Sequence, residues 1–377
     1  MKKLAIVVTH PIQYNSPWFK LLTEIGKVQL KVFYTWPQAI HGFDDPDFGH
    51  KVSWDIPLLE GYEYELVENV SNTPSSKAWS GIDCPALIPS IEKYSPNAIL
   101  VIGWKLKSHF AVMRYFKGKI PVWFRGDSTL LDEIPGFKQK IRRIGLKMVY
   151  RYVDKAFYVG KASKAYFLAH GVAEGDLVYA PHAIDNERYA TFRKERNGKE
   201  KNRNFKLVFC GKLELKKRPD LLVDAVQTYN KSNSEPIRLD IAGNGALERE
   251  LLELVKDDEN ICMIGFQNQS QMPSVYGDAD VFCLPSEGPG ETWGLAVNEA
   301  LASGTPVIVS DKVGCAQDIV NGKNGYVFKS GDLVDLIKGI KDLKKRQVNP
   351  KDCHESIQPW NFKRICEALE NELNKTS

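Results

Sequence analysis

Short apolar runs rich in β-branched and aromatic residues alternate along this chain with amphipathic stretches. That alternation is typical of βα units, which build parallel sheets covered by helices on both faces. Each half of the chain holds enough such runs for a doubly wound sheet of its own, so the predicted fold class is α/β. The predicted strands are residues 4–9, 28–35, 98–103, 121–125, 156–160 and 177–181 in the first half, and 206–211, 238–243, 261–265, 281–285, 306–311 and 326–328 in the second.

The two halves are separated by a segment, FRKERNGKEKNRN at residues 192–204, that is almost wholly charged or amide-bearing. We interpret it as a solvated connection between domains spanning 1–195 and 204–357. A basic arm for nucleic acid is the alternative, but Glu195 and Glu200 interrupt its charge. At 377 residues the chain is longer than one hydrophobic core usually supports, which agrees with two domains.

The C-terminal segment, about 358–377, contains apolar residues at helical spacing between 360 and 373. A helix with such a face needs a surface on which to pack. We therefore expect it to return to one of the two domains.

Composition narrows the class of protein. A content of 43% hydrophobic and 26% charged residues is that of a globular protein, and the net charge of +4 is too small to favour nucleic acid. The charge is compatible with phosphorylated substrates or an anionic membrane surface. Seven cysteines without a Cys-x-x-Cys pair predict reduced, mostly buried thiols. The apolar stretch after Met1 is too short for a signal peptide, and no run is long enough to span a membrane, so we expect a cytoplasmic protein.

The stretch from Val281 to Asp311 is the most informative for chemistry. An apolar strand is followed by a Gly- and Pro-rich loop and by a helix that opens near Gly294. The free N–H groups at such a helix start suit a phosphate. Glu291 lies in the loop and Glu299 about one and a half turns into the helix, so both can contact one ligand. The alternative is that Glu291 caps the helix and Glu299 is a surface residue.

Several motifs in this half occur together and in order. They are Pro285-Ser286, Glu291-x-x-Gly294-Leu295, Asn298-Glu299-Ala300, Gly304-x-Pro306-Val307-Ile308 and Gly314. Together they resemble the donor-site signature of retaining GT-B glycosyltransferases of family 4, also called glycosyl transferases group 1. The resemblance covers nearly the whole C-terminal half. It is thinner in the N-terminal half, where Gly160 and residues 181–185 carry it.

The resemblance implies a fold of two Rossmann-like, doubly wound domains facing across a cleft. The first would hold the acceptor and the second the nucleotide-sugar donor, with the C-terminal helix packing back on the first. By the same resemblance Glu291 holds hydroxyls of the donor sugar and Glu299 binds the nucleotide ribose. The backbone amides of Gly294 and Leu295 would meet the diphosphate.

A basic loop follows the first strand of the second half. After Gly211, Lys212 and Lys217 match the cations that stabilise the leaving diphosphate in the family. Relatives more often have Arg at the position of Lys212 and Gly at that of Arg218, so Lys216 or Arg218 is an alternative to Lys217. Solvated loop charges are the other interpretation.

Five further residues complete the predicted site. Gly243 ends the second strand of this half and is interpreted either as a ligand contact or as part of a tight βα turn. Phe266 follows the third strand, and the resemblance implies that the nucleotide base lies there. In the first half, His10 is a ligand residue or a loop histidine, and its loop lacks the glycines common in the family. His109 is a candidate donor-sugar contact or a helix residue. Arg125 is a cleft residue or half of a structural Arg–Asp pair.

One stretch, 137–152, combines six cations with apolar residues at helical spacing. A basic amphipathic helix of this kind can lie on an anionic bilayer. The alternative is an ordinary helix that buries one face against its own sheet.

We therefore expect a transferase that moves a sugar from a UDP- or GDP-sugar to an acceptor hydroxyl on a glycan, a lipid-linked acceptor or a small molecule. The resemblance implies retention of configuration and a role in polysaccharide or glycolipid biosynthesis. We expect no cofactor and no metal, because no His/Cys cluster with ligand spacing occurs. Two alternatives stay open: a nucleotide-sugar epimerase or hydrolase of the same fold, and a non-catalytic sugar-nucleotide-binding protein. The expected location is cytoplasmic, with possible peripheral contact at the inner face of the membrane.

Overall fold

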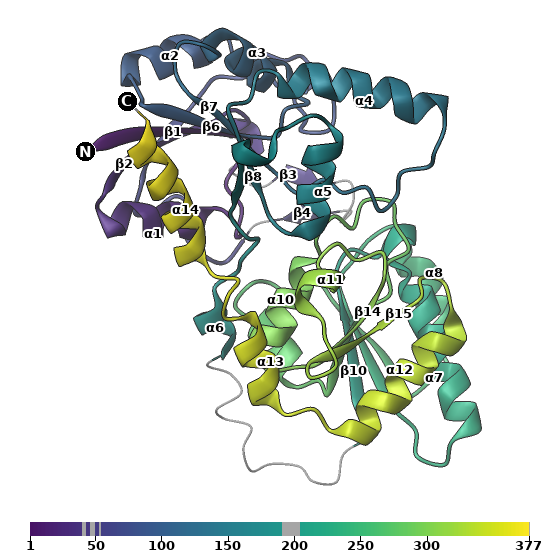
Figure 1. Ribbon diagram of the computed structural model, residues 1–377. Helices are drawn as coiled ribbons and strands as arrows, with labels where there is room; N and C mark the ends of the chain where they lie inside the picture. Colours follow the sequence, from purple (N-terminus) through teal and green to yellow (C-terminus); the bar gives the residue numbers. More distant parts are fainter. Residues whose placement is uncertain (40–42, 46–49, 53, 191–203, 377) are drawn as a thin grey trace. The chain divides into compact units, whose positions relative to one another are not determined.

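The computed structural model describes residues 1–39, 43–45, 50–52, 54–190 and 204–376 (Figure 1). It divides into two compact units. Unit 1 comprises residues 1–43, 56–182 and 362–377, and unit 2 comprises residues 44–55 and 183–361.

Unit 1 is built on a parallel sheet of seven strands in the order β5-β2-β1-β6-β7-β8-β9. The chain adds strands outward from β1 in one direction and then in the other, so the sheet is doubly wound. The elements of unit 1 are β1 Lys2–Val8, α1 Ser16–Ile25, β2 Val28–Tyr34, η1 Pro37–Ala39, β5 Glu63–Leu66, η2 Trp79–Gly81, α2 Leu87–Tyr94, β6 Ala98–Ile102, α3 Lys107–Phe116, β7 Val122–Gly126, α4 Phe137–Tyr150, β8 Lys155–Tyr158, α5 Lys161–Ala169, η3 Glu174–Asp176, β9 Leu177–Tyr179 and α14 Phe362–Lys375. Two short strands, β3 Phe43–Asp45 and β4 His50–Val52, pair separately.

Unit 2 has a six-stranded parallel sheet in the order β12-β11-β10-β13-β14-β15. Numbered within the unit this is 3-2-1-4-5-6, the order of dinucleotide-binding folds, in which ligands bind beside the carboxyl ends of the two central strands. The elements of unit 2 are α6 Asn186–Ala190, β10 Lys206–Cys210, η5 Leu215–Lys217, α7 Pro219–Ser232, β11 Arg238–Ala242, α8 Glu248–Val255, β12 Ile261–Gly265, α9 Met272–Gly277, β13 Val281–Leu284, α10 Leu295–Ala302, β14 Val307–Ser310, α11 Ala316–Ile319, β15 Gly325–Phe328, α12 Leu333–Arg346 and α13 Pro350–Ile357.

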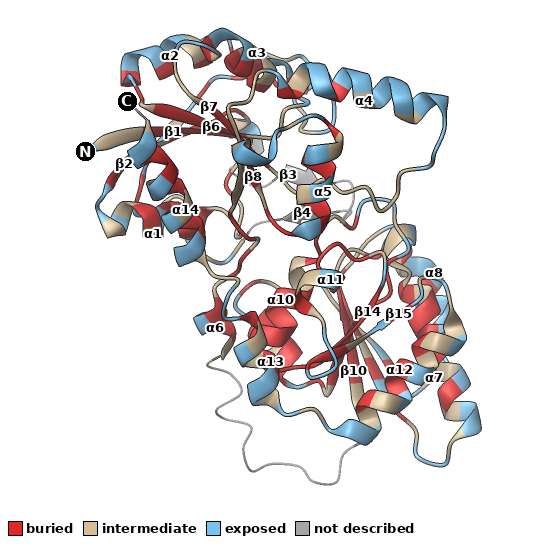
Figure 2. Ribbon diagram, in the orientation of Figure 1, coloured by how far each residue is buried: buried red, intermediate tan, exposed pale blue. Residues whose placement is uncertain are grey.

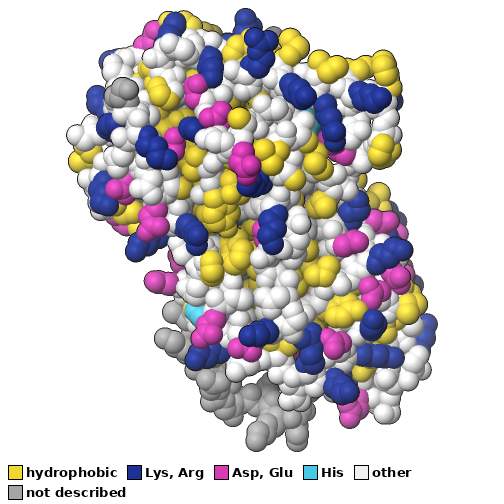
Figure 3. Space-filling view, viewed as in Figure 1, with side chains coloured by type: hydrophobic (Ala, Val, Ile, Leu, Met, Phe, Trp, Pro, Cys, Tyr) yellow, Lys and Arg dark blue, Asp and Glu magenta, His cyan; other side chains and the backbone are white. Residues whose placement is uncertain are grey.

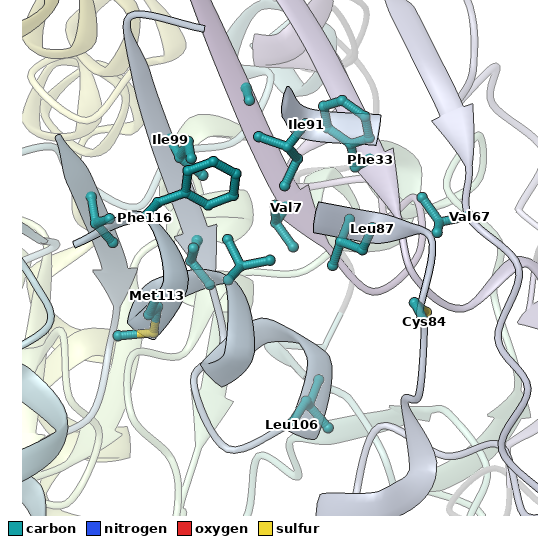
Figure 4. Close-up of a cluster of buried hydrophobic side chains, with 14 of the residues drawn as sticks. Val7, Phe33, Val67, Cys84, Leu87, Ile91, Ile99, Leu106, Met113 and Phe116 are labelled. Atoms are coloured by element: carbon teal, nitrogen blue, oxygen red, sulfur yellow. The ribbon is translucent and has the colours of Figure 1, made fainter. Parts of the chain in front are cut away.

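Each unit has its own hydrophobic core. In unit 1, side chains from β1, β2, β6, α2 and α3 meet on one face of the sheet, as Figure 4 shows for Val7, Phe33, Ile99 and Met113. The central strands of unit 2 are likewise buried, and they appear red in Figure 2. Strands covered on both faces are continuous apolar runs, which explains the strength of the sequence signal.

Every strand that the apolar pattern predicts is present, with ends that differ by no more than two residues. The expected fold of two Rossmann-like α/β domains is therefore confirmed. The pattern missed β5, whose sequence EYEL is mostly exposed because the strand lies at the edge of its sheet.

The unit boundary differs from the expected one. The structure divides the chain after His182, because α6 packs against α9 and α10 in unit 2. Most of the expected connection at 192–204 lies outside the described residues. The C-terminal helix α14 belongs to unit 1, where Cys366 Sγ lies 3.6 Å from the carbonyl oxygen of Trp18.

Two further expectations concern thiols and membranes. All seven cysteines are free, and all but Cys262 are buried. Among the helices that the structure describes, none is both long and apolar enough to cross a bilayer.

Candidate functional site

The central strands of unit 2, β10 and β13, are neighbours in the sheet. The loop after β10 leads into η5, which ends at Lys217, and the loop after β13 contains Glu291. Lys217 Nζ lies 2.7 Å from Glu291 Oε2, and both side chains are largely buried, with exposed fractions of 17% and 10%. The fold thus places an ion pair at the point where ligands bind in such sheets.

Glu291 is held by neighbours on three elements. Ser286 Oγ donates a hydrogen bond of 3.1 Å to Glu291 Oε2, the same oxygen that Lys217 contacts. The backbone N–H of Gly314 donates to the Glu291 carbonyl at 3.0 Å. Helix α10 instead takes Gly294 as its N-cap, without a side-chain hydrogen bond, so Glu291 is not a helix cap. The capping alternative does not hold.

The three cations after Leu215 have different partners. Lys216 pairs with Glu214 at 3.1 Å, and Arg218 pairs with Asp220 and Glu287. Only Lys217 of the three contacts Glu291 among the described residues. Arg218 adopts a left-handed backbone with φ of 51°, a conformation that glycine adopts more easily than other residues.

Lys212 is the second predicted cation. It follows Gly211 at the end of β10, is half-buried, and precedes the fully buried Leu213. The Lys217 side chain runs past Gly211. The Cδ of Lys217 lies 3.4 Å from the position that a Cβ on Gly211 would occupy. Both lysines therefore leave the same loop at the carboxyl edge of the sheet.

Two glycines are required here, one by close backbone packing and one by its backbone conformation. A Cβ on Gly243 would stand 2.0 Å from the carbonyl oxygen of Gly211, so only glycine lets the ends of β10 and β11 approach. Gly294 has φ of 91° immediately before Leu295, the first residue of α10. As the N-cap, Gly294 offers no side-chain acceptor to the first turn of α10, and its carbonyl accepts from the Val297 N–H at 2.9 Å. The start of a helix without a capping side chain suits an anionic ligand.

Glu299 lies within α10 and is only 3% exposed, which excludes the surface alternative. The hydroxyl of Tyr276 on α9 donates to Glu299 Oε2 at 2.8 Å. Burial, and then the nearby Glu299 carboxylate, raise the pKa of the Cys210 thiol well above its ordinary value, so this thiol stays protonated. Glu299 is thus a fixed acceptor in a sparingly solvated environment.

The Phe266 region carries a contact that the sequence did not predict. Residues 44–55 belong to unit 2, and the Trp54 ring lies 6.4 Å from that of Phe266, tilted by 46°. The Asp55 carboxylate accepts hydrogen bonds of 3.2 Å from the backbone N–H of Ser270. An aromatic pair therefore lies beside the carboxyl end of β12.

In unit 1, two histidines lie near the carboxyl ends of β1 and β6. His10 is half-buried, its Nδ1 is 3.0 Å from Thr9 Oγ1, and Trp36 packs edge-on against its ring at 5.3 Å. His109 is fully buried in the first turn of α3. Its Nε2 is 2.8 Å from Thr35 Oγ1 and its Nδ1 2.8 Å from the Gly103 carbonyl, which favours the structural interpretation of His109.

Arg125 is the penultimate residue of β7 and is 4% exposed. Its guanidinium donates to the carbonyls of Ala180 and Pro181 at 2.6 and 2.8 Å, so it ties β7 to the chain after β9. Burial lowers the pKa of Arg125 to about 10, although Asp127 opposes this. The arginine is held mainly by backbone, and Asp127 lies 3.4 Å from His182 instead.

Chemically, unit 2 brings together two buried carboxylates, a lysine pair and the start of α10, whose N-cap is a glycine. Carboxylates accept from hydroxyl groups, while lysines and helix-start amides bind phosphate. Within the described part of the chain, no group of three or more His, Cys, Asp or Glu residues could hold a metal ion. Tyr276 and Trp54 were missed because each reaches the site from a separate element.

Residues 191–359 match the family described as glycosyl transferases group 1. The sulfoquinovosyl transferase SQD2 of Arabidopsis thaliana is 25% identical over 44% of this chain and 32% of its own length. The UDP-Gal:alpha-D-GlcNAc-diphosphoundecaprenol alpha-1,3-galactosyltransferase of Escherichia coli is 24% identical over 64% of this chain and 67% of its own. The chain thus spans about a third of the length of the Arabidopsis thaliana relative and about two thirds of the length of the Escherichia coli relative.

Among solved structures, the sucrose-phosphate synthase of Thermosynechococcus elongatus aligns over 100% of this chain and 99% of its own, with a TM-score of 0.73 and 16% identity. At that identity the likeness supports the fold alone. The family match and the relatives support glycosyltransferase function for this chain.

Proposed function

We propose that this chain transfers a sugar from a nucleoside diphosphate sugar to an acceptor hydroxyl, with unit 2 as the donor-binding domain. The observation that carries the proposal is the ion pair between Lys217 and Glu291 beside the central strands β10 and β13. A carboxylate and a cation placed there match the two ends of such a donor, a hydroxyl-rich sugar and a diphosphate.

In this proposal Glu291 accepts hydrogen bonds from the donor sugar, and Ser286 fixes its carboxylate. The Glu299 carboxylate, oriented by Tyr276, accepts from the ribose hydroxyls. Lys212, Lys217 and the N–H groups at the start of α10 stabilise negative charge on the diphosphate as the bond to the sugar breaks. Phe266 and Trp54 border the nucleotide base.

The stereochemical outcome that we propose is retention, following the resemblance of Glu291, Gly294 and Glu299 to the family 4 motif. No side chain near Glu291 is assigned as a base, and a donor phosphate oxygen would take the acceptor proton. We propose a UDP- or GDP-sugar as donor and a glycan or lipid-linked acceptor. The name of the Escherichia coli relative, with UDP-Gal and a diphosphoundecaprenol acceptor, supports that choice.

A binding experiment tests the donor site first. Melting of the protein is followed with UDP, GDP and ADP, because a ligand of the folded state raises Tm by mass action. We expect one nucleotide to raise Tm in the wild type and in Glu287→Ala. Glu287 is an exposed carboxylate of the same loop and serves as the matched control. Replacing Lys217 by Met should weaken the shift, and no shift with any nucleotide would contradict the proposal.

Turnover is then measured with the selected donor and a panel of lipid-linked and glycan acceptors. Loss of hydrogen bonds to a charged group costs about 1.5–3 kcal/mol, so Glu291→Ala should lower kcat/KM at least about tenfold while Glu287→Ala changes little. The anomeric configuration of the product, read by NMR, tests retention. Epimerisation of the donor without acceptor would instead favour an epimerase.

Removal of metal ions tests a separate part of the proposal. If Lys212 and Lys217 supply the positive charge at the diphosphate, turnover in EDTA should stay within about twofold of the untreated enzyme. Restoration of lost activity by Mg²⁺ or Mn²⁺ would show that a metal is needed.

A further inference from the structure

Helix α4 has two apolar faces, and only one of them is covered. Leu146 and Tyr150 are buried in a cluster with Phe124, Tyr166 and Phe167. The other face, together with the loop before the helix, carries large exposed apolar side chains. Their exposed fractions run from 55% at Ile141 on the helix to 85% at Ile134 in the loop. They are Ile134, Phe137, Ile141, Ile144 and Met148, which we call the α4 stripe.

The spacing of the α4 stripe places its members together. At about 100° per residue, positions 137, 141, 144 and 148 fall within about 60° of the helix circumference, opposite Leu146. From Phe137 to Met148 the stripe runs for about 16 Å along the helix, at about 1.5 Å per residue. Figure 2 shows α4 as a mostly exposed helix at the edge of unit 1.

The orientation of α4 about its axis is fixed by a buried carboxylate. Glu133 accepts hydrogen bonds from Gln139 at 2.7 Å, from Arg142 at 3.1 Å and from Arg143 at 2.9 Å. Burial alone would raise the pKa of Glu133, but these donors lower it below its ordinary value, so the carboxylate stays charged. The helix cannot roll to cover the stripe without breaking this network.

Cations border the α4 stripe on both sides. At about 100° per residue, Lys140, Lys147 and Arg151 lie along one side and Lys138 along the other. No acidic residue occurs between 137 and 151. Among the described residues, these four exposed cations have no carboxylate within ion-pair distance. Figure 3 shows hydrophobic and basic side chains interleaved over the region of this helix.

The charge decides which occupant fits. A second copy of the chain would bring the same cationic borders against each other, and like charges at close range repel. An anionic bilayer offers an apolar layer below a plane of phosphates. The α4 stripe can therefore contact the apolar layer while the cations beside it contact the phosphates. A helix of this kind buries its apolar face to a depth of about 5–10 Å.

We propose that α4 and the loop at Ile134 form a docking surface for an anionic phospholipid bilayer. The α4 stripe enters the acyl region, and Lys138, Lys140, Lys147 and Arg151 bind lipid phosphates. This inference stands apart from the proposed function, because it concerns binding of the chain to lipid and requires no turnover.

The test is flotation of the full chain with vesicles of phosphatidylcholine alone or mixed with phosphatidylglycerol. We expect flotation only with the anionic vesicles and weakening as salt is added, because salt screens exposed charges. The triple substitution Phe137→Ser, Ile141→Ser and Ile144→Ser should abolish it. Val334→Ser, at a 78% exposed valine of α12, is the matched control and should bind as the wild type does.

The cationic borders are tested separately. Each Lys near an anionic surface contributes about fivefold to binding, so Lys140→Glu with Lys147→Glu should weaken it by well over tenfold. Lys341→Glu with Lys345→Glu, two exposed lysines of α12, is the control of equal charge. All substituted residues are exposed, so thermal melting should match the wild type and verify folding.

Three outcomes would overturn the proposal. They are equal flotation of wild type and serine variant, flotation that is indifferent to phosphatidylglycerol, and a dimer in sedimentation that the serine variant converts to monomer. The last would make the α4 stripe a contact between copies of the chain.

Discussion

Tyr276 and Glu299 show how one hydroxyl can orient a buried carboxylate. The Glu299 side chain is nearly inaccessible to solvent, and Tyr276 donates to it at 2.8 Å. Removing a donor from a buried charged acceptor costs about 1–3 kcal/mol. We therefore expect Tyr276→Phe to lower the free energy of unfolding by that amount in urea titrations, and to weaken nucleotide binding.

The control for this substitution is Tyr326→Phe. The Tyr326 hydroxyl donates at the same distance of 2.8 Å to Asp335, but this pair lies nearer to solvent. Water can replace the lost donor there, so the change in stability should be smaller. If both variants lost the same free energy of unfolding, the burial of Glu299 would not explain the contribution of its hydrogen bond.

His109 predicts a pH dependence of stability. Burial lowers its pKa to about 4 in the folded chain, whereas an unfolded histidine titrates near about 6.5. Between these values the unfolded chain binds a proton that the folded chain does not, so stability falls as pH drops through this window. At about 1.4 kcal/mol per pH unit, the loss is about 3 kcal/mol.

Urea titrations at several pH values between neutrality and pH 4.5 measure this slope. His109→Gln removes the titrating group, so its stability should depend less on pH than that of the wild type, whatever its absolute stability. Parallel curves for the two proteins would show that His109 does not carry the effect.

At the scale of elements, Gly314 connects the loop after β14 with the loop that carries Glu291. A Cβ on Gly314 would stand 1.8 Å from the carbonyl oxygen of Thr292, and backbone cannot yield as a flexible side chain does. We expect Gly314→Ala to displace the Glu291 loop, to lower stability by about 3 kcal/mol and to reduce nucleotide binding. Thermal melting with and without nucleotide measures both.

Gly322→Ala is the matched control in the same unit. Nothing lies within 4 Å of a Cβ at Gly322, so the substitution should be neutral or stabilise slightly by restricting the unfolded chain. If both alanine variants melt alike, the packing of the two loops is looser than the distances indicate.

Individual elements also show which parts of the structure the sequence predicts and which parts it does not. Strands such as β10 and β13 are continuous apolar runs because both faces are covered, so the pattern locates them. Edge strand β5 has no such run. Glu291 and Lys217 were predicted through their motifs, but Tyr276 carries no local signal, because its role depends on how α9 packs beside α10.

Residues 137–152 show why two interpretations of one pattern need not exclude each other. The helix buries Leu146 and Tyr150 against its own unit, as an ordinary helix does, and still exposes Ile141, Ile144 and Met148. Helical periodicity identifies apolar positions, but it does not say which of two apolar arcs the fold covers.

At the scale of the whole chain, unit 1 is assembled from both ends of the sequence. Helix α14 packs on α1 and β1, and Leu369 in its buried face is only 1% exposed. Leu369→Ala should therefore destabilise unit 1 by about 2–5 kcal/mol. Ile340→Ala on α12, at a fully buried position, should do the same to unit 2.

Calorimetry distinguishes these effects, because each unit has a core of its own and we expect two transitions. Leu369→Ala should lower one transition and Ile340→Ala the other. Nucleotide at about 100 times its Kd stabilises the domain that binds it by about 2.7 kcal/mol, so it should raise only the transition that Ile340→Ala lowers. If nucleotide raised the transition that responds to Leu369→Ala, the donor site would have to be sought in unit 1, at the carboxyl ends of β1 and β6.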